Sequence, residues 1–292
     1  MPSKRWIRIT AVVLGVFVGL AITCVFSLQI ASGVMQNRTH PVPVASLTLD
    51  ATPDLARGGH LVAVGCMGCH GGDLGGHQIF DDFPMGRLWS ANLTTGAGGI
   101  GKTFSDADLV RALRYGVAPD SHTVLYMPAR SFSHLSDADL ASIIAFLRTV
   151  PPVNRERPRS RLGPVARVLT VLTPIPLFAA DQVEANPDRT RPPTTDTLGY
   201  GAYIAHTAGC IECHGSGLAG DFGPNLTPGG PVGKWDEATF VRVMRTGKRP
   251  DGTTLTDDMP WKDFSKFDDI ELAAVWRYMR SVPAIAPKEK KS

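Results

Sequence analysis

The stretch VGCMGCHGG, residues 64–72, decides the fold, and AGCIECHGS, residues 208–216, repeats its pattern. Each copy places two cysteines three positions apart and a histidine directly after the second cysteine. The cysteines are Cys66, Cys69, Cys210 and Cys213, and the histidines are His70 and His214. Residues i and i+3 of a helical turn lie on one side of it, so both sulfur atoms of a copy can reach the same neighbouring group.

The order Cys-x-x-Cys-His is the attachment signature of c-type haem. Two thioether bonds fix the porphyrin, and the imidazole beside the second cysteine becomes the proximal ligand of the iron. A zinc ribbon places its Cys-x-x-Cys pairs ~15–20 residues apart, whereas 140 residues separate Cys69 from Cys210. A thioredoxin-like site needs a βαβ context, which the sequence lacks. We therefore predict two covalently bound haem c groups, held by Cys66, Cys69 and His70 and by Cys210, Cys213 and His214.

The two motifs lie in two copies of one repeat. Asn-Leu-Thr, Gly-Lys, an aromatic residue, Arg-x-x-Arg-x-Gly and Pro-Asp recur in the same order in residues 92–120 and 225–251. Further on, YMPARSFSHLSDADLASIIAFLRTVP from residue 126 matches DMPWKDFSKFDDIELAAVWRYMRSVP from residue 258. The repeat predicts two homologous units, residues 50–152 and 197–284.

Each unit is predicted to hold three helices joined by loops, and no convincing alternating strand pattern is present, so the predicted class is mostly α. Thr52 and Pro53 indicate the N-cap and first position of the helix that leads to the first motif. Two serines, each followed three positions later by aspartate, resemble capping boxes for the later helices of the first unit: Ser105 with Asp108, and Ser136 with Asp139.

Residues 153–196 form the predicted linker, and residues 285–292 a charged C-terminal tail. The linker is rich in proline and charge, yet VARVLTVLTPIPLF, residues 165–178, is too apolar to be left in water. We expect this segment to lie across one unit, a partner or the membrane surface. The basic run of the linker is interpreted as a solvated face, with contact to haem propionates or an acidic partner as the second interpretation; it consists of Arg155, Arg157, Arg159 and Arg161.

Haem iron takes a sixth ligand, and the repeat nominates Met127 and Met259, which precede a proline at equivalent positions. A thioether sulfur is a soft, neutral ligand that stabilises ferrous iron and raises the reduction potential relative to two imidazoles. Because histidine and methionine together fill both axial positions, this pattern favours electron transfer. Met85 competes with Met127, since the first unit has 11 extra residues between Cys66 and Asn92, but the equivalence of the repeats favours Met127.

The remaining methionines and histidines are interpreted without iron. Met67 lies inside the attachment loop, where it is poorly placed to bind iron. Two methionines on helices are predicted to be core residues, Met244 and Met279. Two histidines on the first helices of the units are interpreted as flanking or buried residues, His60 and His206. Three histidines have no counterpart in the second unit and are interpreted as surface or loop residues, His77, His122 and His134.

Residues 1–39 form the predicted transmembrane anchor and its flank. No charge occurs from Ile9 to Asn37, a run longer than the ~20 apolar residues that a helix needs to cross a bilayer. Basic residues precede the run, so the positive-inside rule keeps them in the cytoplasm and exports residues 40–292. A cleaved secretory signal is the alternative, although its apolar region is typically ~7–15 residues long. We predict a single-pass protein of a bacterial inner membrane with both haem units on the periplasmic side.

Charge and cysteine content exclude two other classes of protein. The formal net charge of +3 is too small for a nucleic-acid-binding protein, and no stripe of arginine and lysine interleaved with aromatic residues occurs. Five cysteines cannot all pair, and four belong to the two motifs, which disfavours a disulfide framework. The fifth, Cys24, lies in the apolar N-terminal run and is interpreted as a lipid-facing or packing residue.

On these motifs the chain resembles the class I cytochrome c family, as a di-haem, membrane-anchored member. The Cys-x-x-Cys-His, Asn-Leu-Thr and Met-Pro positions, spread over nearly all of residues 50–284, resemble cytochrome c subunits of bacterial periplasmic dehydrogenases. The resemblance implies two tandem cytochrome c domains after the transmembrane helix, covalent haem, and a role in passing electrons. Those subunits usually carry three haem motifs and this chain has two, so the electron donor is not carried over.

The sequence therefore predicts an electron carrier and not an enzyme, with no catalytic residue assigned. A periplasmic or membrane donor, either a dehydrogenase or a quinol-linked complex, would reduce one haem. The electron would pass to the second haem and then to a terminal oxidase or another cytochrome. The alternative is a di-haem redox enzyme, such as a thiosulfate dehydrogenase or a peroxidase, in which one iron keeps an open position.

Overall fold

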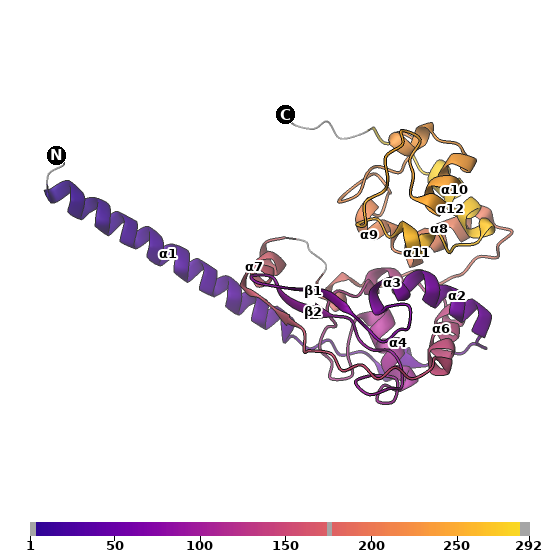
Figure 1. The fold of residues 1–292 in the computed structure, drawn as a ribbon, viewed down its shortest axis with the longest axis horizontal. Coiled ribbons are helices and arrows are strands. Elements are labelled where there is room, and N and C mark those ends of the chain that lie inside the picture. The colour runs from indigo at the N-terminus through magenta and orange to yellow at the C-terminus, as the bar shows by residue number, and fades with distance from the viewer. Residues whose placement is uncertain (1–3, 174–176, 287–292) are drawn as a thin grey trace.

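The computed structural model describes residues 4–173 and 177–286, and the fold is mostly helical, as predicted (Figure 1). A long N-terminal helix precedes two helical units, and a small sheet lies beside the first unit. Three predicted segments fall partly outside the described residues: the first three residues of the anchor, residues 174–176 of the apolar linker segment, and residues 287–292 of the C-terminal tail.

The N-terminal helix α1 (Lys4–Gln36) is long and apolar enough to cross a membrane. Its apolar side chains are exposed up to Phe26, and the helix becomes partly covered from Leu28 onward. The cover is α7 (Pro164–Leu172) of the linker. Gln29 Nε2 donates to the Pro164 carbonyl at 2.7 Å, and the hydroxyls of Ser32 and Thr170 share a buried hydrogen bond of 2.9 Å.

The first unit follows a single 3-10 turn, Val44–Leu47. Its helices are α2 (Leu55–Gly65), α3 (Met67–His70), α4 (Asp106–Tyr115), α5 (Ala129–Phe132) and α6 (Asp137–Thr149). The second unit repeats this order with α8 (Thr197–Thr207), α9 (Cys210–His214), α10 (Glu237–Thr246), α11 (Trp261–Phe264) and α12 (Asp269–Ser281), with short 3-10 turns at Ala179–Gln182 and Pro231–Lys234. Apolar side chains of each set of helices form a separate core cluster, which is the packing expected of a duplicated unit.

The first and last helices of each unit cross at a glycine. A Cβ atom added to Gly58 of α2 would collide with the Ser142 carbonyl oxygen of α6. At the equivalent place, a Cβ atom on Gly201 of α8 would collide with the Ala274 carbonyl oxygen of α12. Only glycine allows the two backbones to approach this closely, so the same crossing is built twice.

The helix starts agree with the sequence in part. Ser105 and Asp108 form the predicted capping box of α4. The predicted start at Thr52 and Pro53 is wrong: α2 begins two residues later, because the Asp54 carboxylate accepts hydrogen bonds from the backbone N–H groups of its first turn. At α6 only half of the predicted box forms, since Ser136 accepts from the Asp139 N–H but its own N–H bonds elsewhere.

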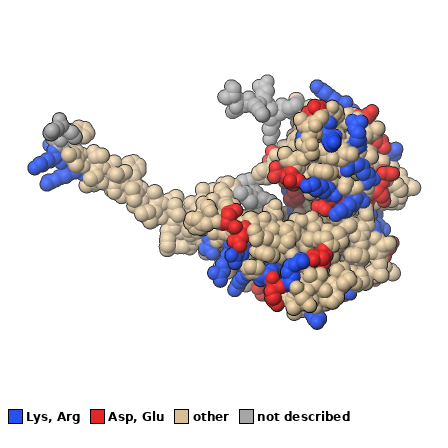
Figure 2. Space-filling model, viewed as in Figure 1, with Lys and Arg blue, Asp and Glu red and all other residues tan. Residues whose placement is uncertain are grey.

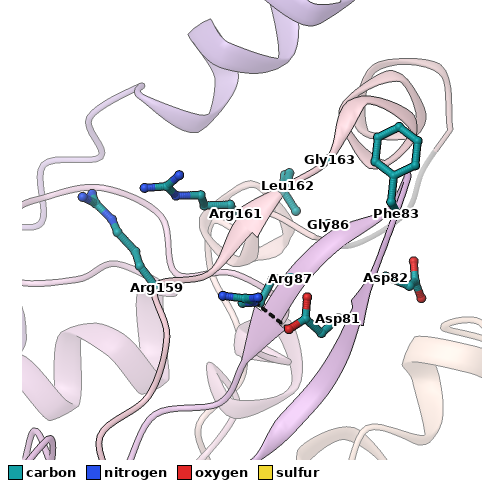
Figure 3. Close-up of a pocket in the computed structure, with 9 residues that line it drawn as sticks. All are labelled: Asp81, Asp82, Phe83, Gly86, Arg87, Arg159, Arg161, Leu162 and Gly163. Carbon is teal, nitrogen blue, oxygen red and sulfur yellow. Dashed lines mark hydrogen bonds and ion pairs between the residues drawn. The ribbon is translucent and has the colours of Figure 1, made fainter.

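The sheet was not expected from the sequence. Strands β1 (Gln78–Asp82), β2 (Gly86–Trp89) and β3 (Arg161–Leu162) pair antiparallel in that order. The β1–β2 hairpin occupies the extra residues of the first unit, and β3 comes from the linker. Figure 3 shows a surface groove along this sheet, where Arg87 donates to Asp81 at 2.6 Å and Phe83 stands 88 % exposed at the hairpin turn. None of the motif residues lines this groove.

The linker is attached to the first unit along much of its length. Arg155 forms an ion pair with Asp73 at 2.8 Å and donates to the Gly76 carbonyl, while its side chain stays 40 % exposed to solvent. Further on, the Leu177 carbonyl accepts from the Tyr126 N–H, and Arg189 donates to the Ser133 carbonyl. The apolar segment therefore lies across α1 and the first unit.

Candidate haem-attachment sites

The attachment motifs form short helices, α3 and α9, that directly follow the first helix of each unit. In the first motif the N–H groups of Cys69 and His70 both bond the Cys66 carbonyl, which closes a helical turn. The first cysteine of each motif faces the core, with Cys66 buried and Cys210 partly buried, whereas Cys69 and Cys213 are exposed. None of the four forms a disulfide. Burial raises the pKa of the Cys66 and Cys210 thiols to about 12, which disfavours the thiolate that disulfides and metals require.

The two histidines are held in one tautomer by backbone carbonyls. His70 Nδ1 lies 2.8 Å from the Ala91 carbonyl oxygen, and His214 Nδ1 lies 2.7 Å from that of Pro224. A carbonyl oxygen only accepts, so Nδ1 donates in both cases and Nε2 keeps its lone pair for a metal. Burial lowers the pKa of both imidazoles and thereby favours the neutral form that binds iron. His214 Nε2 is buried without a hydrogen-bond partner, as expected of an atom that binds a metal.

The Asn-Leu-Thr strings hold these carbonyls in place, a role that sequence reasoning missed. Asn92 directly follows Ala91, and its amide donates to the Val153 carbonyl at 2.7 Å while its oxygen accepts from Thr94. In the second unit Asn225 follows Pro224 and makes the same bonds to the Ile285 carbonyl and to Thr227. Each buried asparagine therefore ties the carbonyl that orients the histidine to the chain that follows the last helix. The recurrence of Asn-Leu-Thr in both units was the signal for this role.

The predicted axial methionines pack on the core of their own unit. Met127 is partly buried against the cluster that contains Cys66, and Met259 against the cluster that includes Cys210. Met85 packs elsewhere, against a third cluster that contains Leu162 and Phe178 beside α1. The packing therefore groups Met127 and Met259 with the attachment cysteines, and it separates Met85 from them.

The other methionines and histidines lie mostly where the sequence places them. Met244 and Met279 are buried core residues, as predicted. His60 bonds the Glu271 carboxylate at 2.7 Å. His134 lies in a loop between α5 and α6, as one of its two predicted placements, but it is buried at 5 % exposure and packs edge-on against His206 with ring centres 5.0 Å apart. The sequence around His134 gave no sign of this contact with the second unit.

The donor sets of the motifs fit a c-type haem, since paired thiols precede a histidine whose Nε2 is available. A small apolar cavity between the two units lies beside Cys66, lined by Leu113 and Ile143 of the first unit and by Ile204 and Thr207 of the second. Tyr126, next to Met127, is 47 % exposed, and its N–H donates to the Leu177 carbonyl. When bound, haem c supplies an iron that alternates between the ferrous and ferric states. The chain supplies the thiols, the oriented imidazole and an apolar wall.

Two units that each combine paired thiols, a carbonyl-oriented histidine and an apolar wall define a c-type cytochrome. The chain belongs to the family described as cytochrome c oxidase, cbb3-type, subunit III, which matches residues 53–147 and 199–279. The match falls in two segments, one over each attachment motif. Membership of a cytochrome c family implies covalently bound haem c, in agreement with the two motifs.

Several cytochrome subunits are similar to this chain. The fructose dehydrogenase cytochrome subunit of Gluconobacter japonicus is 29 % identical over 306 residues, which cover 91 % of this chain and 59 % of the relative. The alcohol dehydrogenase (quinone) cytochrome c subunit of Gluconobacter oxydans is 27 % identical, covering 81 % and 56 %. A diheme cytochrome c-type protein of Cereibacter sphaeroides is 28 % identical, covering 80 % and 88 %. The chain thus spans less than two thirds of the dehydrogenase subunits and most of the diheme protein.

Proposed function

We propose that the chain is a membrane-anchored electron-transfer protein with one haem c in residues 50–152 and another in residues 197–284. The iron of the first would be bound by His70 and Met127, and that of the second by His214 and Met259. The proposal is supported mainly by one arrangement that occurs in both units. A buried asparagine anchors the segment whose preceding carbonyl accepts from Nδ1 of the motif histidine, which leaves Nε2 available to bind iron. With protein ligands on both sides of each iron, the units suit outer-sphere electron transfer.

The redox partners follow from the relatives. Three of the similar proteins are named as cytochrome subunits of fructose, alcohol and gluconate dehydrogenases. By analogy, a dehydrogenase would supply electrons to this chain, and a terminal oxidase or another cytochrome would accept them. Weak and small docking surfaces serve such transient electron-transfer contacts.

The membrane anchor is part of the proposal. Figure 2 shows α1 as an almost uncharged rod with basic residues at its start, which are Lys4, Arg5 and Arg8. From Ile9 to Leu28, before the linker covers the helix, α1 rises about 30 Å, close to the ~30 Å hydrocarbon core of a bilayer. This length and the basic start support a retained anchor in a bacterial inner membrane, with the haem units on the periplasmic side.

Ligand binding to the purified, reduced protein tests the function. The proposal predicts low-spin c-type absorption bands from both haems and no spectral change with carbon monoxide, because protein side chains occupy all axial positions. Ready binding of carbon monoxide at one haem would contradict the carrier and favour a di-haem redox enzyme with an open iron.

A further inference from the structure

The two units meet through contacts that are themselves duplicated. The interface between the units is formed by four helices of each unit (Figure 1). These are α2, α3, α5 and α6 of the first unit, and their respective equivalents in the second unit, α8, α9, α11 and α12. A contact between one element of the first unit and another of the second recurs with the units exchanged. This is the pattern of an isologous, two-fold interface, formed here within one chain.

The first duplicated contact joins the first helix of one unit to the start of the last helix of the other unit. His60 of α2 bonds Glu271 Oε2 of α12 at 2.7 Å. Tyr203 of α8, which is equivalent to His60, donates to Asp139 Oδ2 of α6 at 2.7 Å. Asp139 and Glu271 occupy the same position of the repeat, three residues after a helix cap. Each carboxylate therefore binds a side chain from the opposite unit.

One arginine joins the two carboxylates. Arg57 Nη1 lies 2.7 Å from Glu271 Oε1, and Arg57 Nε lies 3.3 Å from Asp139 Oδ1. Both carboxylates are fully buried, at 0 % exposure. A buried carboxylate is tolerated only when it is paired and hydrogen-bonded, so separation of the units would leave Glu271 without two of its partners. We name the group of Arg57, His60, Asp139, Tyr203 and Glu271 the inter-unit cluster.

Further exchanged contacts run from the inter-unit cluster to the attachment motifs. Ser131 of α5 donates to Glu212, which lies between Cys210 and Cys213, at 2.6 Å. At the equivalent place of the first motif, Gly68 lies between Cys66 and Cys69, and a Cβ atom added to Gly68 would collide with the Asp263 carboxylate of α11. Each attachment helix, α3 or α9, therefore contacts the short helix that follows the Met-Pro pair of the other unit, α11 or α5.

Two more contacts show how closely the motif regions approach. Lys266 donates to the Ala63 carbonyl at 2.9 Å, and its equivalent His134 packs on His206, the equivalent of Ala63. Val64, two residues before Cys66, is buried in the core cluster of the second unit. The residues that flank each attachment motif therefore lie against the other unit, while Cys69 and Cys213 stay exposed.

We propose that the inter-unit cluster is a latch that holds the two haem units as one electron-transfer pair, in which electrons cross directly between the attachment faces. Asp139 and Glu271 are its positioning residues. The inference rests on the proposed function, since it needs a haem in each unit. The step moves one electron from a reduced iron, which becomes oxidised, to an oxidised iron, which becomes reduced, with no bond formed or broken and no proton transferred.

The test uses the full-length protein with both haems and compares a variant that removes contacts between the units with a variant that removes a contact within one unit. In the test variant, H60A with Y203F, Asp139 loses its hydrogen bond from Tyr203 and Glu271 loses its hydrogen bond from His60, while the ion pair between Arg57 and Glu271 stays. In the matched control, Y200F, a neighbouring hydroxyl that bonds Glu271 within its own unit at 3.5 Å is removed. Two quantities are measured in each variant: the rate of tryptic cleavage after Arg189, whose side chain bonds the Ser133 carbonyl of the first unit, and the rate at which an electron equilibrates between the haems after rapid photoreduction.

Hydrogen bonds to charged groups are strong enough that the loss of two weakens docking about tenfold or more. Cleavage follows the population of the open form, so it should rise about tenfold in H60A/Y203F, with slower equilibration between the haems, while Y200F behaves as the parent. Unchanged cleavage in H60A/Y203F would overturn the latch. Faster cleavage with unchanged equilibration would overturn the crossing at this face. A parent protein without two haems would instead refute the proposed function, and Y203F alone serves if the double variant does not fold.

Discussion

The two units share one haem holder but differ in what surrounds it. In both, a buried asparagine fixes the carbonyl that orients the histidine, and a Met-Pro pair packs on the same core as the first cysteine. The first unit adds the β1–β2 hairpin, and the linker wraps around it. The second unit lacks that hairpin, and the chain after its last helix reaches only Ile285 to meet Asn225. Attachment is thus duplicated, whereas the hairpin and its pairing with the linker strand β3 are found in the first unit.

The largest effect should come from removing one attachment motif. Substitution of Cys210 and Cys213 by serine should remove the haem of the second unit and leave that of the first, because each unit holds its own pair of thiols. The haem content per chain, measured from the pyridine haemochrome spectrum, should fall by half. Substitution of Cys66 and Cys69 is the matched control and should give the same loss. Loss of both haems in either variant would show that the units do not attach haem independently.

The axial ligand of the first unit separates the two candidate methionines. M127A should open one iron and allow carbon monoxide to bind, because Met127 packs with the attachment core. M85A should leave the spectrum unchanged, since Met85 packs beside α1. M259A should open the second iron in the same way as M127A opens the first. Carbon monoxide binding in M85A, and not in M127A, would reverse the assignment.

The buried asparagines should contribute equally to the two units. N92A and N225A each remove the hydrogen bonds that the asparagine makes to a buried carbonyl and to a buried threonine, which costs about 1–3 kcal/mol of unfolding free energy. Denaturant unfolding of the holoprotein measures this loss, and the reduction potential of the affected haem should shift as its histidine loses its fixed carbonyl. N154A is the control, because Asn154 makes an exposed contact to Ala97 and should cost less than about 1 kcal/mol. A loss no larger than that of N154A would contradict the role of the asparagines.

The smallest expected effect is a loss of unfolding free energy at low pH through protonation of Glu271. Burial favours the protonated form of Glu271, but hydrogen bonds from His60 and Arg57 outweigh it and hold the pKa of this carboxyl below its usual value. Tyr200 and the Asp268 N–H also face it. A depressed folded-state pKa stabilises the protein above the unfolded-state pKa, about 4.3, and the gain is lost as the pH falls through the folded-state value. Unfolding free energy should therefore decline below about pH 4, and E271Q should show a shallower decline; an identical pH dependence would contradict this.

The sequence predicted the parts of the fold that depend on short spacings. The cysteine and histidine positions, the repeat and the capping of α4 each involve residues within a few positions of one another, and local geometry determines their arrangement. The start of α2 was missed by two residues, because Asp54 is a stronger cap than Thr52 and lies closer to the helix. The repeat also showed that Met127 and Met259 are equivalent, but it did not indicate where Met85 packs.

The sequence did not predict contacts between distant segments. β3 pairs with a hairpin that lies more than 70 residues earlier, and the five residues of β1 do not alternate. Arg57, His60 and Asp139 look like ordinary polar surface residues of helices. Nothing near them in the chain indicates that Arg57 and His60 bind Glu271 of the other unit, or that Asp139 binds Tyr203. Such partners are set by how the two units dock, which short-range patterns do not encode.

The most direct test of the account is the mass of the intact, denatured mature chain. The account predicts the polypeptide mass increased by two covalently bound haem groups, which remain attached after extraction with acidified organic solvent. A chain that carries no added haem mass, or one whose colour passes into that solvent, would contradict the claim that each unit binds its own haem through its pair of cysteines.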